Sequence, residues 1–238
     1  MMKACTNNKR LNQAGFTLVE IAIVLVIIGL LLGGILKGQE MITQAKIKNV
    51  INDMTGVAAA MYGYQDRYRA LPGDDPNAGT RWNGTATSGD GNGVIIGTYT
   101  AAITSAAGAL PITGPESVLF WHHLRLAGFV SGSGASQPFN AVSGMMGVQT
   151  STGNAATLTT GVLASPGPTN PITSLILCSA NLPDKIAVSV DAQTDDGNGQ
   201  TGSVRAQLQG GATNPAVAAT ADQYVETGTN TYLVCKTF

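Results

Sequence analysis

The sequence predicts an α+β fold, in which a long N-terminal helix precedes an antiparallel β-sheet. Residues 16–36 form a run of 21 predominantly apolar residues, and residues 47–62 place apolar side chains at steps of three and four. No proline occurs between residues 16 and 71, so one helix can include both segments. Residues 172–238 then alternate strand-like runs with turn-forming pieces.

The apolar run is long enough to cross a bilayer. At about 1.5 Å per residue its helix would span about 31 Å, which is the thickness of a hydrocarbon core. Lys3, Lys9 and Arg10 precede the run, and the positive-inside rule therefore predicts that the start of the chain lies in the cytoplasm. We expect a helix over residues 16–70, membrane-spanning over 16–36, and a globular β-rich head over 71–238.

The charge pattern argues against nucleic-acid binding. The chain has 13 Lys and Arg against 14 Asp and Glu, and its formal net charge is −1. Basic residues are neither abundant nor clustered after residue 16, so the sequence lacks the basic surface that a nucleic-acid partner requires.

One carboxylate interrupts the apolar run. Glu20 lies near its start, and an ionised carboxylate near the middle of a bilayer costs roughly 2.5–3.5 kcal/mol. The nearest cations all precede the run, so Glu20 requires a partner that this part of the chain does not supply.

The stretch GFTLVE at Gly15 to Glu20 follows a basic leader and opens the apolar run. It resembles the N-terminus of type IV pilins and type II secretion pseudopilins. The resemblance implies that residues 1–15 are a leader, and that prepilin peptidase cuts between Gly15 and Phe16 and methylates the new amine of Phe16. It also implies that Glu20 neutralises the N-terminal amine of a neighbouring subunit, and that the head is pilin-like.

The three cysteines are Cys5, Cys178 and Cys235. If the leader is removed, two remain, and both would follow the membrane helix into a periplasm-like compartment that oxidises thiol pairs. We expect a disulfide between Cys178 and Cys235; the alternative is two buried free thiols.

No catalytic residues are predicted, and we expect that the protein is not an enzyme. A short helix is expected within TGPESVLFWHHLRLAGF, and the only histidines, His122 and His123, are adjacent on it. Neighbours on a helix lie about 100° apart, so the two cannot face one metal ion. We expect one to be packed and the other exposed.

Two glycine-rich acidic turns resemble each other, GDGNG at 89–93 and DDGNG at 195–199. Alternating Asp and Asn oxygens can bind calcium, with Asp195, Asp196 and Asn198 as the first candidates. Neither turn has the twelve-residue loop of an EF-hand, and Asp-Gly and Asn-Gly are also ordinary hairpin turns. No cofactor or metal site is therefore assigned, and calcium is kept as an alternative.

The head is expected to be an antiparallel meander, in which Cys178 and Cys235 join the first and last strands. Loops and edge strands are expected over residues 130–171. Expected strands cover residues 94–100, 172–179, 185–192, 203–208 and 231–238.

These features predict a structural subunit, a prepilin that is cleaved, N-methylated and polymerised into a type IV pilus-like filament. Its partners would be prepilin peptidase, identical or related subunits, the inner membrane and the pilus assembly machinery. The precursor would cross the inner membrane once with a periplasmic head, and then reach a cell-surface pilus or a periplasmic pseudopilus. The alternatives are a type II secretion pseudopilin, a minor pilin, or a membrane-anchored periplasmic binding or enzymatic domain.

Overall fold

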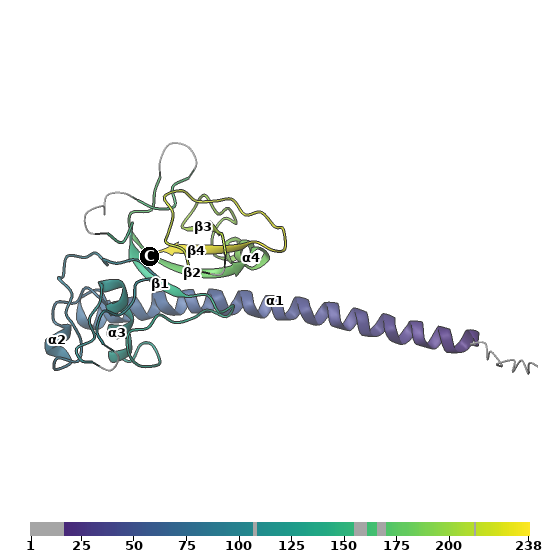
Figure 1. Ribbon diagram of the computed structural model, residues 1–238, viewed down its shortest axis with the longest axis horizontal. Coiled ribbons are helices and arrows are strands. Elements are labelled where there is room, and N and C mark those ends of the chain that lie inside the picture. Colours follow the sequence, from purple (N-terminus) through teal and green to yellow (C-terminus); the bar gives the residue numbers. More distant parts are fainter. Residues whose placement is uncertain (1–16, 107–108, 155–160, 166–169, 212) are drawn as a thin grey trace, which may run out of the picture. The chain divides into compact units, whose positions relative to one another are not determined.

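The computed structural model describes residues 17–106, 109–154, 161–165, 170–211 and 213–238 (Figure 1). The predicted processing junction, Gly15 and Phe16, lies outside the described residues. Backbone contacts divide the chain into two units, one up to Thr43 and one over Gln44–Phe238.

Helix α1 (Leu18–Tyr68) is the longest element and contributes to both units. Its bounds agree closely with the predicted helix, and Figure 1 shows it as one continuous coil. It ends where Arg69 turns to a positive φ of 57°, a left-handed conformation typical of helix ends. Pro72, three residues later, cannot continue a helix.

The part of α1 within the second unit is amphipathic and forms one wall of the main core. Its buried residues follow steps of three and four, as expected for one helical face. They are Ile47, Val50, Met54, Val57, Ala60, Met61 and Tyr64.

The head contains one antiparallel sheet, as predicted. Its strands are β1 (Met146–Thr150), β2 (Leu175–Pro183), β3 (Val204–Gln209) and β4 (Thr231–Thr237). The order is β1-β2-β4-β3, with every neighbouring pair antiparallel. The expected meander order was therefore wrong: β4, the last strand in the chain, pairs with both β2 and β3.

Both faces of the sheet are buried. Leu177 of β2 and Val234 of β4 face the core that includes α1. Cys178 and Cys235, one position along each strand, face a second core with Tyr99. Successive side chains of a strand point to opposite faces, so these near-continuous apolar strands fill two cores.

Within the described part of the head, three short helices accompany the sheet. Helix α2 covers Ala78–Arg81, α3 covers Glu116–Leu126 and α4 covers Asp184–Thr194. Helix α3 lies where the sequence predicted it: Pro115 precedes it, and Gly128 follows its end with a φ of 80°. In Figure 1, α2 and α3 lie beside the C-terminal end of α1.

The expected strand at residues 185–192 was wrong, because this segment is helix α4. Ile186, Val188 and Val190 alternate as in a strand, but the buried residues are Ile186, Ala187, Val190 and Asp191. That spacing matches one helical face. Pro183 stands directly before the helix, a position that suits proline.

The expected strand at residues 94–100 was also wrong. This segment is irregular and lies along β1, where the Thr150 N–H donates to Ile95 O at 3.1 Å and the Tyr99 N–H to the Gln149 side chain at 2.9 Å.

Strand β1 falls within 130–171, where edge strands were expected. Its Gly147 lies so close to Tyr99 that an added Cβ would be 2.2 Å from the Tyr99 carbonyl oxygen, so only glycine fits there.

Candidate functional site

Glu20 and Thr17 bind each other at the start of α1. The backbone N–H and the hydroxyl of Thr17 each donate to Glu20 Oε2 at 2.8 Å, and the Glu20 N–H donates to Thr17 Oγ1 at 3.3 Å. This reciprocal pattern is a capping box, which satisfies backbone donors that the first turn of a helix leaves free. A negative charge here also interacts favourably with the helix dipole.

Only one oxygen of the Glu20 carboxylate takes part in this cap. Among the described residues, no donor reaches Oε1. A carboxylate has lone pairs for several donors. Glu20 can therefore cap its own helix and accept a second donor at the same time.

The helix beyond Glu20 is apolar and exposed. An 18-residue window of α1 has a mean hydropathy of 2.8, and none of it is buried within the chain. Leu18 is 86% exposed and Leu30 is 74% exposed. By length and composition this helix can cross a membrane, and its apolar surface requires lipid or other helices.

The structure joins Cys178 and Cys235 in a disulfide with an S–S distance of 2.10 Å. The two residues lie directly opposite each other on β2 and β4, and both are fully buried. The bridge therefore ties together two central strands that are 57 residues apart in sequence.

Both histidines of α3 are buried, so the expectation that one is exposed was wrong. His123 Nδ1 accepts the Gly73 N–H, and Nε2 lies 2.9 Å from Thr87 O. Burial is the main cause that lowers the pKa of His123 to about 4. This ring is thus a neutral link between α3 and the loops that follow α1.

The first glycine-rich turn closes around a carboxylate. Asp74 is buried and accepts the backbone N–H groups of Gly91 at 2.6 Å and Gly93 at 2.7 Å. Carboxylate oxygens of Asp74, Asp90 and Glu116 lie within 4.8 Å of one another. Desolvation raises the pKa of Asp74, and desolvation together with the two neighbouring carboxylates raises that of Glu116.

The second turn contains the three calcium candidates, Asp195, Asp196 and Asn198. Asp195 and Asp196 lie with Asp191 in a cluster whose carboxylate oxygens are within 4.8 Å of one another. Asp195 Oδ2 already accepts the Ser203 N–H at 2.5 Å. The side-chain oxygen of Asn198 accepts the Gln200 N–H at 3.1 Å. Carboxylate oxygens are the type of ligand that calcium prefers. Some of these oxygens already accept hydrogen bonds from backbone N–H groups, so a calcium site here stays a prediction.

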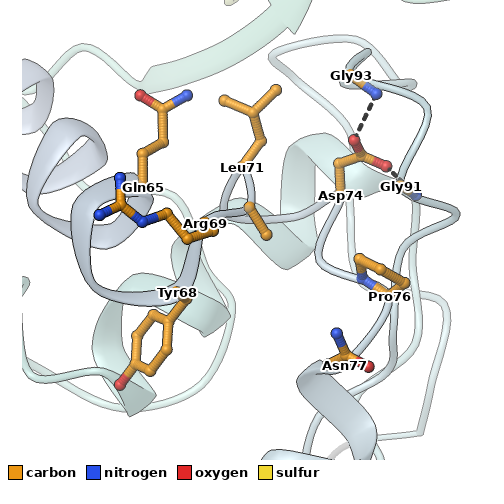
Figure 2. A pocket seen from close by; sticks show the side chains of 10 residues that line it. Gln65, Tyr68, Arg69, Leu71, Asp74, Pro76, Asn77, Gly91 and Gly93 are labelled. Atoms are coloured by element: carbon orange, nitrogen blue, oxygen red, sulfur yellow. Dashed lines mark hydrogen bonds between the residues drawn. The ribbon is translucent and has the colours of Figure 1, made fainter.

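A pocket lies beside the C-terminal end of α1 (Figure 2). It has a volume of about 500 Å³. Figure 2 shows the Asp74 carboxylate turned toward Gly91 and Gly93, away from Arg69. The Arg69 guanidinium lies 3.9 Å from Asp66 and is largely exposed. The described lining residues include no pair of nucleophile and base of the kind that acyl transfer uses.

The N-terminal segment matches a known protein-family motif. Residues 10–36 match the prokaryotic N-terminal methylation motif. This is a prepilin-type N-terminus. The motif is the hallmark of type IV pilin and pseudopilin precursors, and it includes Gly15, Phe16 and Glu20. Most of the chain lies outside the matched residues. No curated protein and no solved structure matched the chain.

The capping role of Thr17 beside Glu20 was not among the predictions from the sequence. The pattern Thr-x-x-Glu directly before an apolar run is typical of a capping box, and residues 17–20 read TLVE. The pattern was therefore present in the prepilin-type motif, but it was interpreted only through Glu20. No local sequence pattern predicts long-range contacts such as the hydrogen bonds between Asp74 and the turn at residues 89–93.

Proposed function

We propose that this protein is a prepilin, cut between Gly15 and Phe16, methylated at the amine of Phe16 and polymerised into a pilus-like filament through its N-terminal helix. The observation that carries the proposal is the prepilin-type motif at residues 10–36, followed by an exposed apolar helix with one carboxylate in its first turn.

The capping box supports a specific role for Glu20. Cutting after Gly15 would leave a cationic amine one residue before Thr17, at the positive end of the helix dipole. Glu20 Oε2 holds the start of its own helix, and Oε1 is available to the amine of a neighbouring subunit. The two interactions use different oxygens, so a subunit would not lose its cap when it joins the filament.

The exposed helix supports polymerisation. Inside a bilayer, apolar helices gain little from water exclusion by associating, because lipid tails are as apolar as their side chains. Once a helix leaves the bilayer, its apolar surface gains about 25 cal/mol per Å² when neighbours bury it. An ion pair between Glu20 and a neighbour's amine would also remove two unpaired charges from that apolar surface.

The proposal is tested by peptide mass spectrometry of the N-terminus, on protein from envelopes and from filaments sheared off the cell surface. We expect N-methyl-Phe16 as the first residue, and its recovery in the sheared fraction. Recovery of the processed chain in the envelope alone would favour a periplasmic pseudopilus or a minor subunit. A chain that keeps residues 1–15 and stays in the membrane would overturn the proposal and favour an anchored periplasmic domain.

A further inference from the structure

The pocket at the C-terminal end of α1 has the size of a site for a small ligand. Its volume of about 500 Å³ lies within the range of roughly 300–1,000 Å³ that is typical of ligand sites. All of its lining residues belong to the second unit. Figure 2 shows Gln65, Tyr68 and Arg69 on one side of it, and Pro76 and Asn77 on the other. The pocket therefore forms where the end of the long helix meets the loop before α2.

The side-chain amides of this pocket are not used by the fold. Within the described residues, no hydrogen bond involves the amide of Gln65 or the amide of Asn77. The backbone N–H of Asn77 donates to Asp75 at 2.8 Å, but its exposed side chain does not cap α2. Each amide has two donor hydrogens and an acceptor oxygen. Both sides of the pocket thus offer donors and acceptors to a ligand.

The end of α1 adds backbone acceptors. The last four carbonyl groups of a helix have no partner within the helix. Gln65 O accepts the Arg69 N–H at 2.8 Å, but among the described residues no donor reaches the carbonyl oxygens of Asp66, Arg67 and Tyr68. The carbonyl groups of a helix point toward its C-terminal end, which is where this pocket lies.

The charges that line the pocket balance each other. They are Arg69 and Asp74. The Asp74 carboxylate is already bound by the N–H groups of Gly91 and Gly93. The Arg69 guanidinium has a contact of 3.9 Å with the exposed Asp66, which leaves its other donors to a ligand. An anion would meet Asp74 and the negative end of the helix dipole, and a cation would meet Arg69. The pocket therefore favours a neutral ligand.

Apolar surface lies between the polar groups. Leu71 and Pro76 supply it. A purely apolar ligand would leave the amides without the hydrogen bonds that they make to water, which costs free energy. Such a ligand fits better in the groove that Asp53, Phe129 and Phe139 line, whose walls are mainly apolar. The pocket at the end of α1 instead suits a ligand with many hydroxyl groups and a small apolar face.

We propose that this pocket binds a neutral sugar residue of a glycan chain. A hydroxyl group donates one hydrogen bond and accepts up to two, so sugar hydroxyls can pair with the amides of Gln65 and Asn77, with the Arg69 guanidinium and with the free carbonyls of α1. The C–H groups of the sugar ring would pack on Leu71 and Pro76. The site lies in the head and does not depend on the proposed polymerisation, so either proposal can fail without the other.

The test uses the full chain, solubilised in a detergent that has no sugar headgroup. Saturation-transfer difference NMR measures the binding of three neutral probes, lactose, maltose and diacetylchitobiose, and of one acidic probe, sialyllactose. We expect saturation transfer to the ring protons of at least one neutral probe. If none of the three neutral probes binds, the proposal is wrong.

Variants then locate the binding. Gln65→Ala and Asn77→Ala each remove one amide and should each lower the affinity for the neutral probe about fivefold. The matched control is Gln193→Ala, at an exposed amide of α4 outside the pocket, and it should leave the affinity unchanged. Thermal unfolding would verify that all three variants are folded. Unchanged affinity in both pocket variants, or an equal loss in the control, would overturn the site.

Arg69→Asn separates a neutral from an anionic ligand. Arg69 has a φ of 57°, and Asn tolerates this left-handed conformation, so the backbone should remain. We expect the neutral probe to bind about tenfold more weakly, because one charged donor is lost. If sialyllactose alone binds the natural sequence, and Arg69→Asn abolishes that binding, the pocket is an anion site and the neutral sugar is excluded.

Discussion

Thr17 holds the carboxylate of Glu20 through two donors, a backbone N–H and a hydroxyl, which reach the same oxygen at 2.8 Å. The carboxylate at the start of the apolar helix therefore has a structural partner before any second subunit arrives. This separates two properties of Glu20, its ability to accept hydrogen bonds and its negative charge.

Glu20→Gln and Glu20→Ala separate these properties experimentally. Gln keeps an amide oxygen that can accept from Thr17, while Ala removes both cap and charge. We expect normal cleavage and methylation of both variants, by N-terminal mass spectrometry, and at least about a tenfold loss of filament from both, since a cationic amine would then be buried without a counter-charge. If Glu20→Gln assembles normally, the cap and not the charge is what assembly requires.

Loss of the disulfide should destabilise the head strongly. In the chain-entropy model, a bridge across 57 residues contributes about 4 kcal/mol. Cys178→Ala/Cys235→Ala is expected to lower the free energy of unfolding by about that amount, measured by urea unfolding of the solubilised protein. Reduction of the native protein with a phosphine should give a similar loss. If the reduced protein kept its full stability, the bridge would be absent or without effect in solution.

Asp191 should lower head stability as the pH rises from about 4 through 6, whereas His123, whose pKa is lowered to about 4, acts in the opposite direction over this range. Burial is the main cause that raises the pKa of Asp191 from 3.8 to about 6, despite the hydrogen bond from Tyr224 at 2.9 Å. A folded-state pKa above the unfolded value means that the folded protein binds the proton more tightly. The resulting stabilisation is fully present below about pH 4 and is lost as the pH rises through 6.

In Asp191→Asn the urea midpoint should therefore rise more, or fall less, from pH 4 to pH 6 than in the wild-type protein, while the raised pKa values of Asp74 and Glu116 still act in the direction of Asp191. Asn can still accept from Tyr224, so the local structure should remain. Asp66→Asn, at an exposed position on α1, is the matched control. An unchanged profile in Asp191→Asn would show that Asp191 does not titrate in this range.

Asp75 connects the end of α1 to the loop that carries α2. It is fully buried and accepts a hydrogen bond from Tyr64 Oη at 2.7 Å, and it forms an ion pair with Arg81. Asp75→Ala would leave both partners without an acceptor and should cost about 3 kcal/mol. Tyr64→Phe removes one hydrogen bond and should cost about 1 kcal/mol. Thermal and urea unfolding would measure both, and equal losses would contradict this order.

The long helix and the antiparallel sheet could be predicted because their patterns are local and repeated. Apolar steps of three and four defined α1 over many turns, and β4 is a short, near-continuous apolar run, as in a strand buried on both faces. Residues 185–192 were wrongly predicted as a strand, because a segment of eight residues can fit both the two-residue period of a strand and the 3.6-residue period of a helix. The place of β4 between β2 and β3 depends on long-range pairing, which no local pattern specifies.

In the candidate site too, residues in a local motif could be predicted, and residues brought together by long-range packing could not. Glu20 was predicted from a short motif. The role of Thr17 could have been predicted from the same motif, because Thr-x-x-Glu is the spacing of a capping box. The groove that Asp53, Phe129 and Phe139 line could not be predicted, because it forms only when distant parts of the chain fold together. The burial of His123 likewise depends on distant loops, because its ring binds Gly73 and Thr87.

The strand order has a consequence for biosynthesis. The central strand β4 comes last in the chain, so β2 has no partner on that side until about fifty further residues have been made. At 5–20 residues per second this interval is roughly 3 to 10 s. During it, Cys178 is an unpaired thiol on an unpaired strand edge, and helpers that shield nascent chains or delay oxidation would act on this protein in that interval.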